Sequence, residues 1–183
     1  TLRRTTTSSV FTLIQIIEGF LSLKIVPTHN QKVLLFHWLK ATLPLIFRED
    51  WDTEKAFIME IFKMQNVPCR VAVIAERRFG KTESVGLFGA IITYYAGIDA
   101  LLVANQLRAA SLLSRKIHSN LVLLGARFDT DNVKEIRFTN ARFAHKSHLR
   151  LDMLPPEAFS YYNITHAHAS NPNAGMWCGV VWN

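Results

Sequence analysis

The chain has 183 residues, 49% of them hydrophobic and 19% charged, so it can bury the core of one ordinary domain. This composition excludes a disordered tail and a collagen-like rod. It carries 21 Lys and Arg against 14 Asp and Glu, and the net charge of +7 fits a polyanionic partner. Two cysteines, Cys69 and Cys178, are too few for a disulfide scaffold and suit a reducing compartment.

The N-terminal third of the chain predicts helices. Apolar residues recur at helical spacing over residues 9–23. A second helix begins near Gln31 and bends or stops at Pro44, because proline lacks the N–H that a helix interior needs. A short amphipathic helix is expected over residues 54–65. We therefore interpret residues 1–66 as a helical segment that leads into a second part of the chain.

The middle of the chain alternates between strand and helix patterns. Residues 70–75, RVAVIA, form a short apolar run that is typical of a central strand. Helical patterns follow over residues 83–96 and 106–124, and the run ALLVA between them, residues 100–104, predicts a second buried strand. This order predicts an α/β fold with a mainly parallel sheet. The middle third also carries +5 of the net +7 charge.

The C-terminal part predicts further strands. Residues 133–145 suggest a hairpin with its turn near Thr139, and strand patterns recur over residues 161–169 and 178–182. Because the sequence stops inside an apolar, strand-like stretch, we expect it to be a piece of a longer open reading frame. We expect no membrane span, since the longest apolar stretch contains a charged residue and three glycines, and no secretory signal.

A phosphate-binding loop is the sharpest motif. The sequence AERRFGKT, residues 75–82, lies between a predicted strand and a predicted helix, where backbone N–H groups and the helix dipole favour a phosphate. Gly80 would let the backbone approach closely, Lys81 would reach the β- and γ-phosphates, and Thr82 would offer its hydroxyl to Mg²⁺. Ala75 stands where the usual pattern G-x-x-x-x-G-K-[ST] has its first glycine.

Two arginines inside the loop, Arg77 and Arg78, are unusual. Either they are solvated surface residues, or one places a guanidinium near the γ-phosphate and neutralises charge that develops during hydrolysis. The segment RRFGKT resembles the loop of the large terminase subunit, the ATPase that packages viral DNA. It shares an arginine three residues before the glycine and lacks the first glycine, and the double arginine is most similar to the herpesvirus form. The segments ALLVANQLRAASLLSRKIHSNL and HASNPNAGMWCGVVWN extend the resemblance, which covers about residues 27–183.

The resemblance implies a P-loop NTPase core over residues 67–183, cut at the Walker B strand, that uses ATP and Mg²⁺. It implies catalytic roles for Lys81 and Arg77, with Mg²⁺ on Thr82. Gln31 is similar to the glutamine that reads adenine in many terminases, although it also suits a plain helix start. The predicted nucleotide-binding residues are Gln31, Arg78, Phe79, Gly80, Lys81, Thr82 and Glu83.

The family's acidic Walker B pair is not visible, since the sequence ends at Asn183, where or just before the pair is expected. Either the chain is cut at Walker B, or Asn183 replaces the aspartate. We therefore expect this stretch alone to bind nucleotide poorly and to hydrolyse it negligibly. The resemblance implies double-stranded DNA, a portal protein, a small terminase subunit and sibling subunits of a homo-oligomeric ring as partners, and no membrane. It implies the host nucleus for a herpesvirus-like protein and otherwise the host cytoplasm. A helicase-like ATPase and a nucleic-acid-binding module without catalysis are the alternatives.

Overall fold

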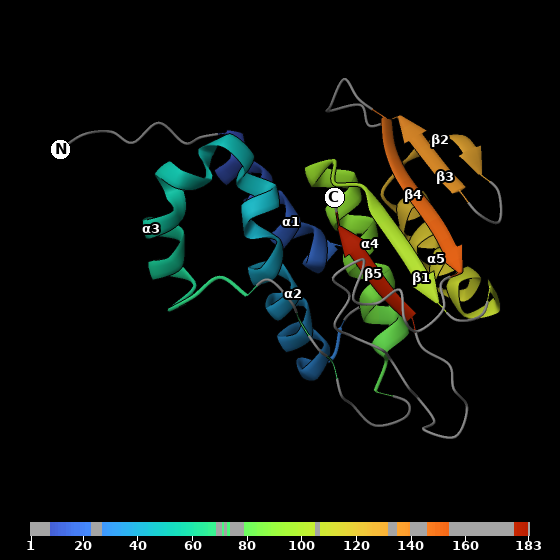
Figure 1. The fold of residues 1–183 in the computed structure, drawn as a ribbon, viewed down its shortest axis with the longest axis horizontal. Helices are drawn as coiled ribbons and strands as arrows, with labels where there is room; N and C mark the ends of the chain where they lie inside the picture. The colour runs from blue at the N-terminus through green and yellow to red at the C-terminus, as the bar shows by residue number, and fades with distance from the viewer. Residues whose placement is uncertain are drawn as a thin grey trace.

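A computed structural model describes residues 8–22, 27–68, 71, 73, 79–104, 107–131, 135–139, 146–153 and 178–182 (Figure 1). Within these residues the chain forms five α-helices, one 3-10 turn and a five-stranded sheet. The helical elements are α1 (Ser8–Ser22), α2 (His29–Phe47), η1 (Arg48–Asp50), α3 (Trp51–Ile61), α4 (Lys81–Ala96) and α5 (Leu107–Leu123). The strands are β1 (Ala100–Ala104), β2 (Arg127–Asp131), β3 (Glu135–Thr139), β4 (Lys146–Met153) and β5 (Cys178–Trp182).

Helix α4 lies at the centre of the fold. Its sequence, KTESVGLFGAIITYYA, is apolar on nearly every side beyond the first turn, which is typical of a buried helix. Helices α1 and α2 pack on one side of it and α5 on the other (Figure 1). At its far end Arg48 donates to the carbonyl oxygens of Ala96 and Gly97, at 3.3 Å each, so a cation satisfies the helix C-terminus.

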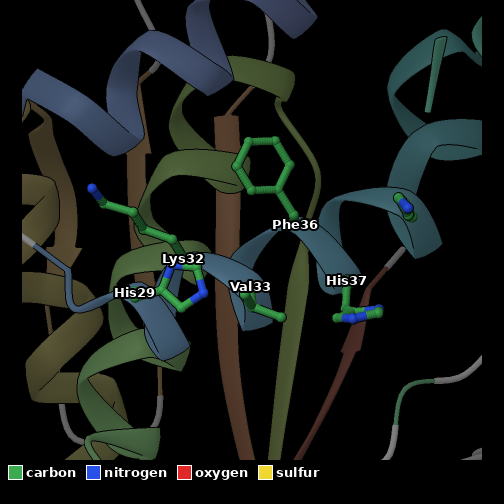
Figure 2. Close-up of a pocket in the computed structure, with 6 residues that line it drawn as sticks. His29, Lys32, Val33, Phe36 and His37 are labelled. Carbon is green, nitrogen blue, oxygen red and sulfur yellow. The ribbon is translucent and has the colours of Figure 1, made fainter. Parts of the chain in front are cut away.

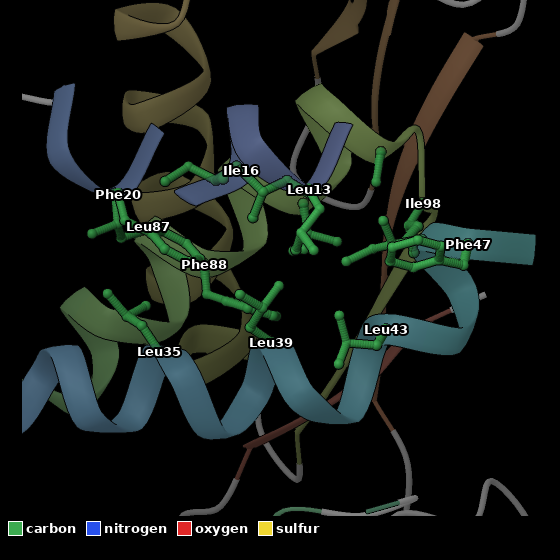
Figure 3. Packing of buried hydrophobic residues seen from close by; sticks show 14 of the residues in the cluster. Leu13, Ile16, Phe20, Leu35, Leu39, Leu43, Phe47, Leu87, Phe88 and Ile98 are labelled. Atoms are coloured by element: carbon green, nitrogen blue, oxygen red, sulfur yellow. The ribbon is translucent and has the colours of Figure 1, made fainter. Parts of the chain in front are cut away.

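The larger hydrophobic core fills the space between α1, α2 and α4 (Figure 3). Aromatic rings meet at its centre, where Phe88 of α4 lies 6.0 Å from the ring of Phe20 and 5.6 Å from the ring of Trp38. Phe88 is only 1% exposed. The N-terminal helices therefore share one core with the helix that follows the phosphate-loop motif.

A second, smaller core lies between α4, α5 and the sheet. The α5 side chains at helical spacing, Leu113, Ile117 and Leu121, are buried against Ile136 and Phe138 of β3. The residue after α5, Leu124, joins their edge, and Gly125 follows in a left-handed conformation with φ of 83°. These apolar residues at helical spacing therefore form the face of α5 that packs on the sheet.

The sheet has the strand order β2-β3-β4-β1-β5. Strands β1 and β4 are parallel, with Leu102 opposite Leu151. The pairs β2–β3, β3–β4 and β1–β5 are antiparallel, and Ala100 of β1 lies opposite Trp182 of β5. Helix α5 crosses from β1 to the β2–β3–β4 meander and contacts both β1 and β4.

The predicted α/β P-loop NTPase core with a mainly parallel sheet is therefore wrong. Helices hold most of the described residues, and three of the four strand pairings are antiparallel. The physical reason lies in the connections. Strand β3 is joined to β2 and to β4 by links far too short for the crossover that parallel neighbours require.

The individual elements agree more closely with the predictions. The helices expected over 9–23, 83–96 and 106–124 are present as α1, α4 and α5, and β1 and β5 have the expected bounds. Pro44 lies inside α2, so the helix continues for three residues past it. The third helix begins and ends earlier than expected, at Trp51 and Ile61.

Other predicted elements fall on residues that the structure does not describe, or differ from what it shows. The strand expected over 161–169 lies outside the described residues. Of the segment 70–75, only Val71 and Val73 are described, and neither lies in a strand. Of the hairpin expected over residues 133–145, the first strand is present as β3, whereas the second strand was expected on residues that lie outside the described part of the chain. Strand β3 pairs antiparallel with β4, which begins beyond the expected range, at Lys146, and β2 was not expected at all. In the described part of the chain, no helix has the length and hydropathy needed to cross a membrane.

Candidate phosphate-binding site

The N-terminus of α4 begins with a glycine in a left-handed conformation. Gly80 is the N-cap residue of α4, with φ of 85° and ψ of 23°. In the described part of the chain, no side chain makes a capping hydrogen bond at this helix end. Its carbonyl oxygen accepts hydrogen bonds from the Ser84 backbone N–H at 2.9 Å and from the Ser84 hydroxyl at 3.0 Å. The first N–H groups of a helix have no acceptor within the helix, so this end is suited to an anion.

Gln31 meets this helix end from α2, 49 residues away in the sequence. Its Nε2 donates to the Gly80 carbonyl oxygen at 3.4 Å, and its Oε1 accepts from the Thr28 backbone N–H at 2.8 Å. The Gln31 backbone N–H in turn donates to Thr28 Oγ1 at 3.3 Å. This reciprocal capping box begins α2 and holds the amide of Gln31 toward the phosphate-loop motif.

The backbone conformation at position 80 favours glycine. The positive φ places an L side chain in a region that costs about 1–2 kcal/mol. A Cβ added to Gly80 would also collide with Nε2 of Gln31, so the flexible end of that side chain would have to move away.

The three residues after Gly80 have different surroundings. Lys81 is buried, with 6% of its surface exposed, whereas the side chain of Thr82 is exposed to solvent. Glu83 is half-buried and pairs with Lys116 of α5, with Nζ and Oε1 2.7 Å apart. The first turn of α4 therefore presents a hydroxyl outward and turns one carboxylate toward the neighbouring helix.

Lys116 is the residue at this site that the sequence did not indicate. It reaches Glu83 because α4 and α5 approach closely at Gly86, where an added Cβ would lie 2.7 Å from the Cβ of Lys116. No short-range motif links the two residues, so the pairing depends on how the helices cross. Gly86, one turn after the motif, is the sequence feature that could have indicated this close approach, because glycine lets two backbones come near each other.

The remaining predicted site residues divide into two groups. Phe79 is described and partly buried next to Gly80. Arg77 and Arg78 lie outside the described residues, so the predicted cis-acting arginine has no geometry here. Thus Gln31, Phe79, Gly80, Lys81, Thr82 and Glu83 are brought together at or beside the start of α4.

The direction of β5 bears on the expected Walker B strand. Trp182 at its end lies opposite Ala100, which follows the C-terminal end of α4 by a short turn. Lys81 lies at the other end of this helix, about 20 Å away at 1.5 Å per residue. A carboxylate placed directly after β5 would therefore emerge away from Lys81, contrary to what a Walker B strand requires.

The described residues contain no cluster of three or more His, Cys, Asp or Glu side chains that could hold a metal ion. Mg²⁺ favours oxygen ligands and often uses few protein groups together with phosphate oxygens and water. The exposed Thr82 hydroxyl fits such a role, because it lies in the same helical turn that faces the expected phosphates.

Comparisons with protein-family models, with curated proteins and with solved structures found no match for this chain. The candidate site is therefore described by its own geometry: a glycine-capped helix start, a buried lysine, an exposed threonine and a glutamine held against the cap.

Proposed function

We propose that the N-terminus of α4 binds the phosphates of ATP, and that the chain belongs to an ATPase that packages viral DNA. The observation that carries the proposal is the contact between Gln31 and Gly80. The sequence resemblance pairs an adenine-reading glutamine with a phosphate loop. The amide of that glutamine reaches the loop's own glycine across 49 residues.

The chemistry of the helix start supports phosphate binding. The helix dipole places partial positive charge at this end, and Gly80 allows a phosphate to approach the backbone. Lys81 is a buried residue at this helix start, and a site shielded from water strengthens the attraction between a cation and an anion. A bound Mg²⁺ would offset the charge of the β- and γ-phosphates, and Thr82 would hold it through its hydroxyl.

Gln31 has the hydrogen-bonding capacity to recognise a base. A glutamine amide offers two N–H donors and two acceptor lone pairs. Among the described residues, Nε2 donates once, to Gly80, and the amide oxygen accepts once, from Thr28. One donor and one acceptor therefore match the N6 amino group and N7 of adenine, the pairing that amide side chains make with this base.

The proposal is tested by titrating the protein with a fluorescent ATP analogue in the presence of Mg²⁺. We expect Lys81→Ala to abolish binding and Thr82→Ala to weaken it only while Mg²⁺ is present. The matched control is Lys55→Ala, which removes an exposed lysine from α3 and should leave binding unchanged. Equal binding by wild type and Lys81→Ala would contradict the proposal.

Base recognition is tested separately from phosphate binding. Competition by unlabelled ATP and GTP compares the two bases on the same phosphate site. We expect the wild type to prefer ATP and Gln31→Ala to bind ATP and GTP alike. A preference for ATP that survives this substitution would remove Gln31 from base recognition while leaving phosphate binding by α4 intact.

A second candidate is a nucleic-acid-binding module that does not hydrolyse nucleotide. The direction of β5 favours it, because the end of this strand lies far from Lys81. The +5 charge of the middle third would then bind nucleic-acid phosphates without sequence preference. DNA binding that weakens steeply with salt and ignores added ATP would support this candidate over the first.

A further inference from the structure

A groove runs along the outer face of α2, on the side away from the core (Figure 2). Leu35, Leu39 and Leu43 of the same helix are buried in the larger core, whereas Val33 and Phe36 on the groove side are 44% and 41% exposed. The described residues that line the groove are His29, Lys32, Val33, Phe36, His37 and Lys40.

The lining residues form two rows at a spacing of four. One row is His29, Val33 and His37, and the other is Lys32, Phe36 and Lys40. On an α-helix, rows spaced four residues apart are the ridges between which a second helix inserts a ridge of its own. In each row an apolar side chain lies between two polar side chains, imidazoles in one row and lysines in the other, so the groove is apolar at its centre and has a lysine near each end.

The charge of the groove is one-sided. Helix α2 contains no Asp or Glu, while Lys32, His29 and His37 are exposed and Lys40 is partly exposed. The two lysines are eight residues apart, which corresponds to about 12 Å along the helix. Two carboxylates that flank an apolar side chain, each four residues from it on a partner helix, would have the same separation.

We propose that this groove binds an acidic amphipathic helix of a partner protein, with the pattern acid-x-x-x-apolar-x-x-x-acid. The apolar side chain covers Val33 and Phe36, and the carboxylates pair with Lys32 and Lys40. A DNA backbone fits less well, because its phosphates would match the lysines but would leave the two apolar side chains without an apolar contact. This inference does not depend on nucleotide binding by α4.

The test uses a fluorescein-labelled helical peptide with Glu-x-x-x-Leu-x-x-x-Glu on one face, and a twin in which both Glu are Lys. Anisotropy titrations should give a Kd in the micromolar range for the Glu peptide and no binding of the twin. The double variant Lys32→Glu/Lys40→Glu should weaken the Glu peptide at least tenfold and gain affinity for the twin. Phe36→Ser should also weaken it, whereas Lys55→Glu on α3 should change nothing.

The reversal of preference separates this groove from general electrostatic attraction. The substituted lysines and Phe36 are outside the core, and circular dichroism checks that each variant keeps its helices. Failure of the Glu peptide to bind, or equal binding by wild type and the double variant, would overturn the proposal. A competition assay asks whether duplex DNA instead displaces the Glu peptide. If that displacement were lost in the lysine double variant but unchanged in Phe36→Ser, the result would overturn the proposal in favour of a nucleic-acid ligand.

Discussion

Substitution of Gly80 by alanine tests the contact on which the candidate site is built. The new Cβ meets two obstacles: a positive φ of 85°, and the side-chain amide of Gln31. Gly125 offers a matched control, because it has nearly the same φ, 83°, and an added Cβ would find nothing within 4 Å. The difference between the two substitutions therefore isolates Gln31.

The magnitudes follow from the geometry. Left-handed alanine costs about 1–2 kcal/mol, which applies to both glycines. At position 80 the flexible Gln31 side chain must also swing away, which breaks its bond to the Gly80 carbonyl and its bond to Thr28. Each such bond contributes about 0.5–1.5 kcal/mol, and the long 3.4 Å bond belongs at the low end. We expect a loss of about 2–3 kcal/mol for Gly80→Ala and about 1–2 kcal/mol for Gly125→Ala.

Urea unfolding followed by circular dichroism measures these losses from the shift of the midpoint. The decisive arm repeats Gly80→Ala in a Gln31→Ala background, where the collision is gone. There the loss should fall to that of Gly125→Ala, which gives a coupling of about 1 kcal/mol between positions 31 and 80. Equal losses for the two glycines in the wild-type background, or no coupling in the cycle, would refute the placement of Gln31 against the loop.

Two further substitutions, Gly86→Ala and Phe88→Ala, test the packing around α4, and a third, Phe36→Ala, is the exposed control. Gly86→Ala would place its Cβ 2.7 Å from the Cβ of Lys116, so it should destabilise the protein by about 1–3 kcal/mol. Alanine normally stabilises a helix interior relative to glycine, so a gain in stability would contradict the close approach of α4 and α5. Phe88→Ala should reduce the free energy of unfolding by about 3–5 kcal/mol and change the fluorescence of Trp38, whose ring is 5.6 Å away. The exposed Phe36→Ala should change stability by less than about 0.5 kcal/mol, and equal losses for the two phenylalanines would argue against the described core.

Much of the helical part of the fold was predictable because its causes are local. Apolar spacing placed α1, α4 and α5 within a few residues of their observed bounds. Gly97 and Gly125 follow α4 and α5 in left-handed conformations, which glycine adopts without steric cost. Pro44 lies in the last turn of α2, and the helix ends three residues after it, at Phe47. Its missing N–H removes one backbone hydrogen bond from the helix, while its carbonyl oxygen still accepts from the Arg48 N–H.

The sheet was less predictable. The segment RFDTD forms β2 although only Phe128 is apolar, since the strand is made by its pairing with β3 and by packing of Phe128 against α5. The ring of His118 on α5 stacks on Phe128 at 4.4 Å, a contact that no local pattern indicates. A polar strand at a sheet edge carries too little hydrophobic alternation to be read from the sequence.

The candidate site also combines features that the local sequence predicts with a contact that it does not. The motif, residues 75–82, was expected to precede a helix over 83–96, and α4 begins two residues earlier than that, at Lys81, with Gly80 as its N-cap. The resemblance predicted that Gln31 belongs to the same site, and it lies against Gly80. The pairing of Glu83 with Lys116 was not predicted, because it depends on the crossing of α4 and α5.

By itself the sequence determined where α1, α4 and α5 run and which residues form the phosphate-loop motif. These properties depend on neighbours within one or two turns. Only the tertiary structure decided that most of the sheet is antiparallel, that Gln31 reaches Gly80 and that the outer face of α2, with Val33 and Phe36 exposed, is left as a groove. Each of these depends on segments distant in the sequence, because strand direction follows from connection lengths and burial follows from which helix faces meet α4.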